Sequence, residues 1–132
     1  MDFGSVNYLA VLLGAVLNMI LGMLWYGPLF GKRWLRLIDK KAEDIQGSPW
    51  LYVASFVAAI VAALMLSVVV QAFGVTGFLG GVLSGGAVWL GFVATVTLTF
   101  SIFEGPKLSV WLLFVLYQLV IFTIEGGVFA VW

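Results

Sequence analysis

Three polar side chains lie within otherwise apolar stretches of this 132-residue sequence, and they are its candidates for chemistry. Glu125 is the firmest of them, because an ionisable residue inside a bilayer is costly and indicates a function by default. It lies about 9 Å from the end of its apolar stretch, at 1.5 Å per helical residue. Gln118 comes two helical turns earlier on the same face, and Asn18 lies near the middle of the first apolar stretch. The pattern predicts an inward-facing polar site in which Glu125 exchanges a proton or binds a cation.

The same side chains also fit a structural role, because a buried carboxyl or amide can hold two membrane helices together. The apolar stretches carry no second carboxylate and no nucleophile–base pair that an intramembrane enzyme would need. The chain has no His, the usual proton shuttle and metal ligand, and no Cys to supply a thiolate. It also lacks the phosphate-binding, HExxH and GxSxG motifs. We therefore expect no enzymatic activity, no metal and no cofactor.

The composition identifies the surroundings of these residues as a membrane. Hydrophobic residues make up 64% of the chain and charged residues only 9%, whereas soluble domains are about 25% charged. A small soluble domain exposes too much surface to hide so many apolar side chains. The net charge is zero, so the overall charge predicts no nucleic-acid partner.

Four stretches are long and apolar enough to cross a bilayer, which takes about 20 residues in a helix. They cover about residues 6–27, 50–73, 77–101 and 108–131. Gly-Pro at 27–28, Pro49 and two Gly-containing turns separate them, and short connections make consecutive helices antiparallel neighbours. The sequence therefore predicts an all-α integral membrane protein: a single domain over residues 1–132 that forms a four-transmembrane-helix bundle.

Eight of the twelve charges lie in the connection between the first two spans, within residues 30–45. Trp34, Leu35 and Ile38 follow helical spacing there, which predicts a short amphipathic helix at the membrane interface. The basic residues of this segment are Lys32, Arg33, Arg36, Lys40 and Lys41. Each would attract anionic lipid by about 1 kcal/mol, although the same residues could serve only to anchor the topology.

The basic residues also predict an orientation. Lys107, the sixth, lies in the third connection, on the same side of a four-span bundle as the first. Because Lys and Arg stay on the cytoplasmic side, we expect both termini outside the cytoplasm of a bacterial inner (plasma) membrane.

Small residues recur at four-residue intervals, a pattern typical of helices that pack closely in lipid. Gly14, Asn18 and Gly22 follow this spacing in the first span, and Gly77, Gly81 and Gly85 follow it in the third. The stripes could pack within one chain or between two. Because four short spans enclose little volume, we expect a homo-oligomer with a pathway between its protomers.

The order of several short motifs resembles a small family of bacterial and fungal membrane proteins known as domain of unknown function 1761. Beside Asn18 and the Tyr117-Gln118 pair, its motif positions here are Gly22, Trp25, Tyr26, Gly31, Trp34, Gly91, Phe92, Glu104 and Gly105. The resemblance implies about four spans and no established reaction. Many members have a His where this chain has Gln118, so the resemblance does not favour a proton relay centred on that position.

Two functions follow as hypotheses. The first is a small bundle that binds or translocates a small solute or ion, with Glu125 in a polar intramembrane site. The alternative is a non-catalytic scaffold or accessory subunit that packs through its Gly and Ala faces and binds anionic lipid.

Overall fold

The structure is a computed structural model that describes residues 1–45 and 47–132. The described chain is helical and has no strand, so the predicted all-α class is confirmed. Four continuous helical stretches are long and apolar enough to cross a membrane. The helices are α1 (Tyr8–Leu24), α2 (Gly31–Leu37), α3 (Pro49–Ala72), α4 (Phe78–Val88), α5 (Thr95–Phe103) and α6 (Leu108–Val131), with π-helical turns at Trp25–Leu29 and Trp89–Ala94 and a 3₁₀ turn at Ala42–Asp44.

Local sequence accounts for where these helices begin. The side chain of Asn7 accepts a hydrogen bond from the Ala10 N–H at 3.1 Å and caps α1. Ser48 caps α3 in the same way, and Pro49 occupies the first helical turn, where its missing N–H has no cost. The predicted spans agree with the observed ones to within two residues at each end.

The first span ends where Gly27-Pro28 predicts. A π-helical turn covers Trp25–Leu29 and is closed by a hydrogen bond from the Phe30 N–H to the Trp25 carbonyl at 2.9 Å. The backbone leaves helical geometry at Gly27, and Pro28 can donate no hydrogen bond. This turn redirects the chain into α2.

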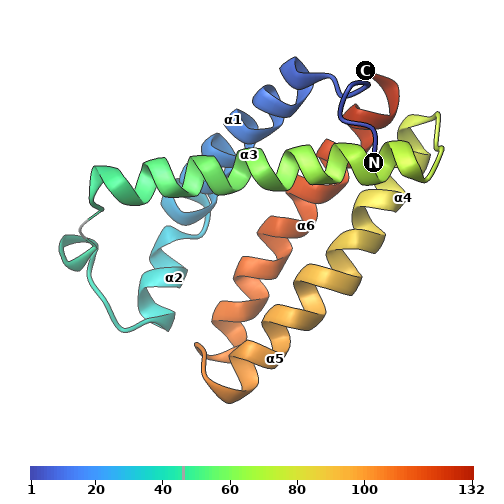
Figure 1. The fold of residues 1–132 in the computed structure, drawn as a ribbon. Helices are drawn as coiled ribbons and strands as arrows, with labels where there is room; N and C mark the ends of the chain where they lie inside the picture. The colour runs from blue at the N-terminus through green and yellow to red at the C-terminus, as the bar shows by residue number, and fades with distance from the viewer. Residues whose placement is uncertain (46) are drawn as a thin grey trace.

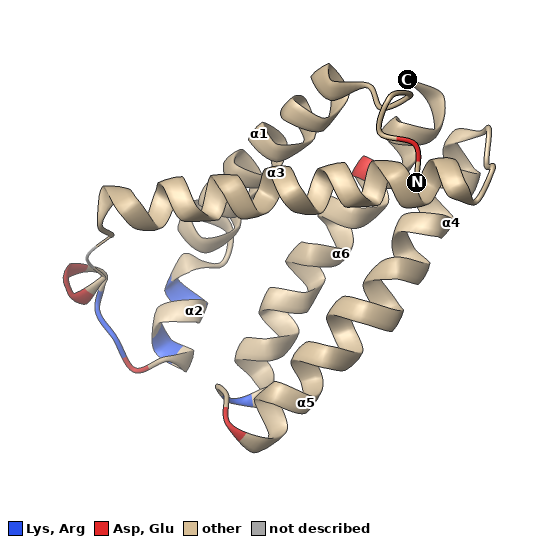
Figure 2. Ribbon diagram, viewed as in Figure 1, with Lys and Arg blue, Asp and Glu red and all other residues tan. Residues whose placement is uncertain are grey.

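The spans form two pairs (Figure 1). The α4–α5 helix and α6 run side by side, and α1 packs on α3. The pairs meet near the two termini, where α3 contacts α6 and α4. At the other end, which carries α2 and the turn between α5 and α6, α3 diverges from α5, while α1 and α2 stay in contact with α6. We call these the terminal end and the basic end, because Lys and Arg gather at the latter (Figure 2).

The tightest helix contact joins α4 to α6 through glycine. A Cβ atom on Gly85 would collide with the Phe122 carbonyl, and one on Gly81 would collide with the Gly126 carbonyl. A Cβ atom on Gly126 would in turn meet the Gly81 carbonyl. The glycine stripe predicted in the third span therefore packs within the chain, as small residues do between membrane helices.

We predict that Gly85→Ala lowers the stability of the bundle by about 1–3 kcal/mol or more, the usual cost of overpacking a close contact. The collision is with backbone, which cannot rotate away. Thermal unfolding in a mild detergent measures the change.

Gly91→Ala is the matched control, because no atom lies within 4 Å of a Cβ added there. Alanine favours helix over glycine by about 1 kcal/mol, so this variant should unfold at the same or a higher temperature. If both variants lowered the unfolding temperature equally, the close contact at Gly85 would not be what stabilises the bundle.

Candidate functional site

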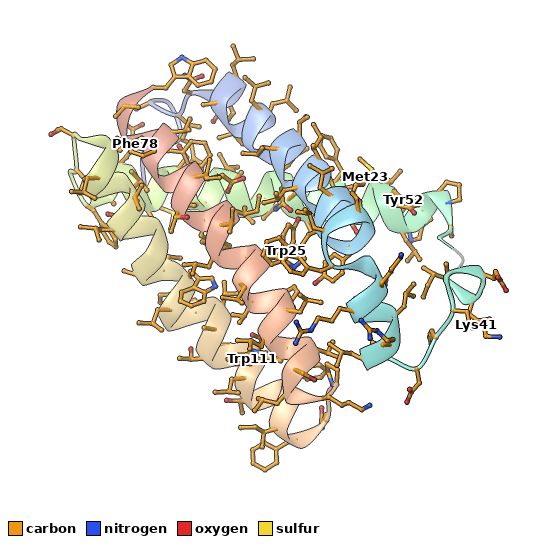
Figure 3. All side chains as sticks on the ribbon, turned by 180° about the vertical axis from the view of Figure 1, so that it is seen from behind. Met23, Trp25, Lys41, Tyr52, Phe78 and Trp111 are labelled. Carbon is orange, nitrogen blue, oxygen red and sulfur yellow. The ribbon has the colours of Figure 1, made fainter. Side chains whose placement is uncertain are left out.

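A cavity of about 1070 Å³ lies between the two helix pairs, where they diverge toward the basic end. α1, α2, α3, α5 and α6 all contribute to its wall. Its aromatic lining comprises Tyr26, Trp34, Tyr52, Phe100, Trp111, Phe114 and Tyr117. Figure 3 shows two of these, Tyr52 on α3 and Trp111 on α6. We expected four short spans to enclose little space, but the divergence of the pairs leaves this volume within one chain.

The cavity wall is uncharged. No Asp, Glu, Lys or Arg belongs to the lining that the structure describes. The side chains that carry a hydroxyl or amide group are Asn18, Tyr26, Tyr52, Ser55, Thr97, Ser101, Tyr117 and Gln118. A mostly apolar wall with a few polar groups is typical of small-molecule pockets. A charged group placed deep in this cavity would lose its hydration without gaining an ionic partner.

The wall includes hydrogen bonds that fix its aromatic side chains. The Trp111 indole N–H donates to the Thr97 hydroxyl at 3.0 Å, and that hydroxyl donates to the Val93 carbonyl in its own helix at 2.5 Å. Next to the wall, the Trp25 indole N–H donates to the Leu113 carbonyl at 3.1 Å and so joins the end of the first span to α6 (Figure 3). These bonds join spans that lipid alone would hold only weakly together.

Asn18 and Gln118 both face this cavity. The Tyr117 hydroxyl donates to the backbone carbonyl of Asn18 at 2.6 Å and also contacts the Asn18 side-chain oxygen. A Cβ atom on Gly22 would lie 3.0 Å from the same hydroxyl, so glycine leaves room for it. The side chain of Gln118 is half-buried and makes no hydrogen bond to another described residue. The structure therefore brings two of the three predicted polar residues to one wall.

Glu125 lies outside the cavity, farther along α6 toward the terminal end. Its side chain is 3% exposed and faces α1, since a Cβ atom on Gly14 would lie 3.0 Å from its Oε1 atom. Oε1 has no hydrogen-bond partner among the described residues. Phe129 borders the same contact. Glu125 is thus sealed within packed helices, and the predicted three-residue cluster divides into a cavity pair and a separate carboxyl.

The basic segment closes the opposite end of the cavity. Trp34 of α2 belongs to the lining and packs edge-on against Tyr26, with ring centroids 5.0 Å apart. Asp39 pairs with Lys107 at 3.9 Å, so the first and third connections lie at the same end of the bundle, as a four-span topology requires. The basic side chains of α2 are exposed, while its tryptophan is half-buried and lines the cavity.

The motif positions have different surroundings. A Cβ atom on Gly31 would lie 2.7 Å from the Tyr26 carbonyl, and one on Gly105 would touch the Phe100 ring, so these two glycines allow tight turns. Gly91 and Phe92 lie on the exposed face of the third span, and Glu104 is exposed in its turn. The structure shows no role for these last three positions.

Sequence reasoning singled out Tyr26, Trp34 and Tyr117 as motif positions but missed the other aromatic residues of the site. Trp111, Phe114 and Gln118 follow at i, i+3 and i+7 and so share one face of α6. Two aromatic residues at this spacing beside a polar one were the signal in the sequence that could have indicated this wall. Tyr52 and Phe100 gave none, because each lies near the end of an apolar helix, where an aromatic residue is ordinary.

The chain matches the family described as "Protein of unknown function (DUF1761)" over residues 9–130. The matched range contains nearly all of the four spans and every residue of the cavity wall. No curated protein and no solved structure matches the chain. The order of motifs from Asn18 to Gln118, the four-span helical fold and the extent of this match agree, and the chain belongs to the DUF1761 family of membrane proteins.

Proposed function

We propose that the protein binds a small, largely uncharged molecule, or the uncharged part of a larger one, inside the membrane. The observation that carries this proposal is the cavity of about 1070 Å³, at the upper end of the roughly 300–1,000 Å³ typical of ligand pockets. Aromatic rings would contact the apolar body of the ligand. Asn18 and Gln118 would accept or donate hydrogen bonds at its inner end.

Replacing Ala58 by Trp should weaken binding, because Ala58 lies on the cavity wall and a large side chain there would narrow the space open to a ligand. Ala58 is exposed, so the helix contacts should survive the change. Native mass spectrometry of protein extracted in a mild detergent would measure the non-covalent mass that stays bound.

Val57→Trp provides the control. Val57 precedes Ala58 on α3, is 53% exposed and is not part of the wall. We expect it to keep the bound mass of the unmodified protein. A bare protein in all three samples, or the same bound mass in all three, would refute the proposed function.

We propose further that Glu125 exchanges protons across the packed terminal end. The observation that favours this role is its buried Oε1 atom without a described partner, in a site where an unpaired charge is expensive. No charged residue of α1, α3 or α4 faces it, since these helices contain none, and the titratable group nearest along α6 is Tyr117. Proton passage would accompany opening of the contact between Gly14 and Glu125.

Glu125→Gln should therefore slow proton entry into proteoliposomes to the rate of empty vesicles. A pH-sensitive dye trapped inside the vesicles would report the entry after an external pH step. Glu104→Gln, which removes an exposed carboxyl in a turn, should retain the original rate. Equal rates for the unmodified protein, both variants and empty vesicles would rule out proton exchange by Glu125.

We place the basic end, and with it the side of the cavity that α2 closes, on the cytoplasmic side of a bacterial inner membrane. Five of the six Lys and Arg residues lie in the first connection, and basic connections remain in the cytoplasm. Both termini would then lie outside.

Because the chain has no Cys, single-Cys variants can test this orientation directly. A membrane-impermeant maleimide added to intact cells should label Thr76→Cys in the turn between α3 and α4 and leave Lys41→Cys unlabelled until the cells are opened. Both positions are exposed. The reverse labelling pattern would invert the proposed orientation.

A further inference from the structure

The cavity has an opening on the side of the bundle. α3 packs on α1 and α6 and reaches α4, but it diverges from α5 (Figure 1). Tyr52, Ser55 and Ala58 on α3 and Phe100 on α5 all belong to the cavity wall, and all are exposed. These four residues lie within the spans. The opening between α3 and α5 therefore faces the acyl chains of the bilayer rather than water.

The wall beside this opening suits a hydrocarbon chain. Between Tyr52 and Trp111 the surface consists mainly of aromatic rings, alanines and the flexible side chains of Met19 and Met23. Methionine adapts its shape to irregular apolar partners. The described lining contains no charged side chain, so an ion or a strongly polar solute would bind less well than lipid already present at this depth.

The charge at the basic end favours an anionic headgroup. α2 carries Lys32, Arg33 and Arg36 and no acidic residue (Figure 2). All three are exposed around Trp34, which lines the cavity from the same short helix. Long basic side chains reach along the interface and keep their charge at headgroup depth. A phospholipid whose phosphate is held there would direct its acyl chains toward the cavity.

We infer that the cavity takes an acyl chain of an anionic phospholipid from the leaflet at the basic end. The chain enters between α3 and α5, and the phosphate stays beside Lys32, Arg33 and Arg36. This inference rests on the proposed function and specifies the class of its ligand. The protein would then remove a lipid chain partly from the bilayer rather than bind a solute from water.

Photo-crosslinking in vesicles tests the inference. The full chain is reconstituted in phosphatidylcholine vesicles that contain a small fraction of either phosphatidylglycerol or phosphatidylcholine with a diazirine at the chain end. The phosphatidylglycerol probe should crosslink to peptides that carry Ala58 or Trp111 about tenfold more than the phosphatidylcholine probe, given the contribution of each basic residue near a membrane surface. Ala58→Trp should reduce these crosslinks and leave those at lipid-facing Leu79, which is 69% exposed.

Neutralising α2 tests the headgroup contact. The triple variant Lys32→Gln, Arg33→Gln and Arg36→Gln should bring the two probes to equal crosslinking. The double variant Lys40→Gln and Lys41→Gln, in the same connection but outside α2, should keep the preference. Equal crosslinking of both probes in the unmodified protein, or crosslinks only at Leu79, would overturn the inference. If a bound mass that depends on Ala58 still appears in mass spectrometry, the proposed function survives that failure; if none appears, the proposed function fails with it.

Discussion

The architecture depends on how closely α4 approaches α6. Gly81 and Gly85 on one helix and Gly126 on the other bring backbone against backbone, with no room for a single additional carbon atom. In lipid, where apolar side chains gain little by leaving the solvent, such contact supplies the packing that holds helices together. The pair α4–α6 is therefore one unit. α1 follows α6 from Glu125 to Leu113, whereas α3 contacts α6 and α4 and diverges from α5. The cavity is the space that this divergence leaves open.

The lengths and positions of the spans could be predicted because the bilayer requires a set length of apolar helix and charges mark its limits. The close packing of Gly81 and Gly85 could also be predicted, but the sequence does not show that α6 is the helix they pack against. Periodicity identifies a face and does not name the helix that covers it. Trp34 shows the same limit: its spacing predicts an amphipathic helix, while its inward position depends on the π-helical turn that contains Pro28.

The candidate site illustrates why a shared helix face is insufficient to define a cluster. Gln118 and Glu125 share a face of α6 by their spacing, yet Gln118 lines the cavity while Glu125 packs against Gly14 of α1. Gly14, Asn18 and Gly22 form a continuous stripe on α1, which meets Glu125 at one end and Tyr117 at the other. The stripe is visible in the sequence. Its register against α6 follows only from the three-dimensional crossing of the two helices.

This register connects the cavity to the buried carboxyl. Tyr117 lines the cavity and bonds Asn18, and Asn18 lies one helical turn from Gly14, against which Glu125 packs. A ligand that displaced the Tyr117 hydroxyl would loosen α1 from α6 at the turn next to Glu125. Glycine at positions 14 and 22 makes the stripe smooth, so a small shift of α1 would meet little steric resistance. Occupation of the cavity and hydration of the carboxyl would therefore be coupled through one helix contact, although no residue belongs to both.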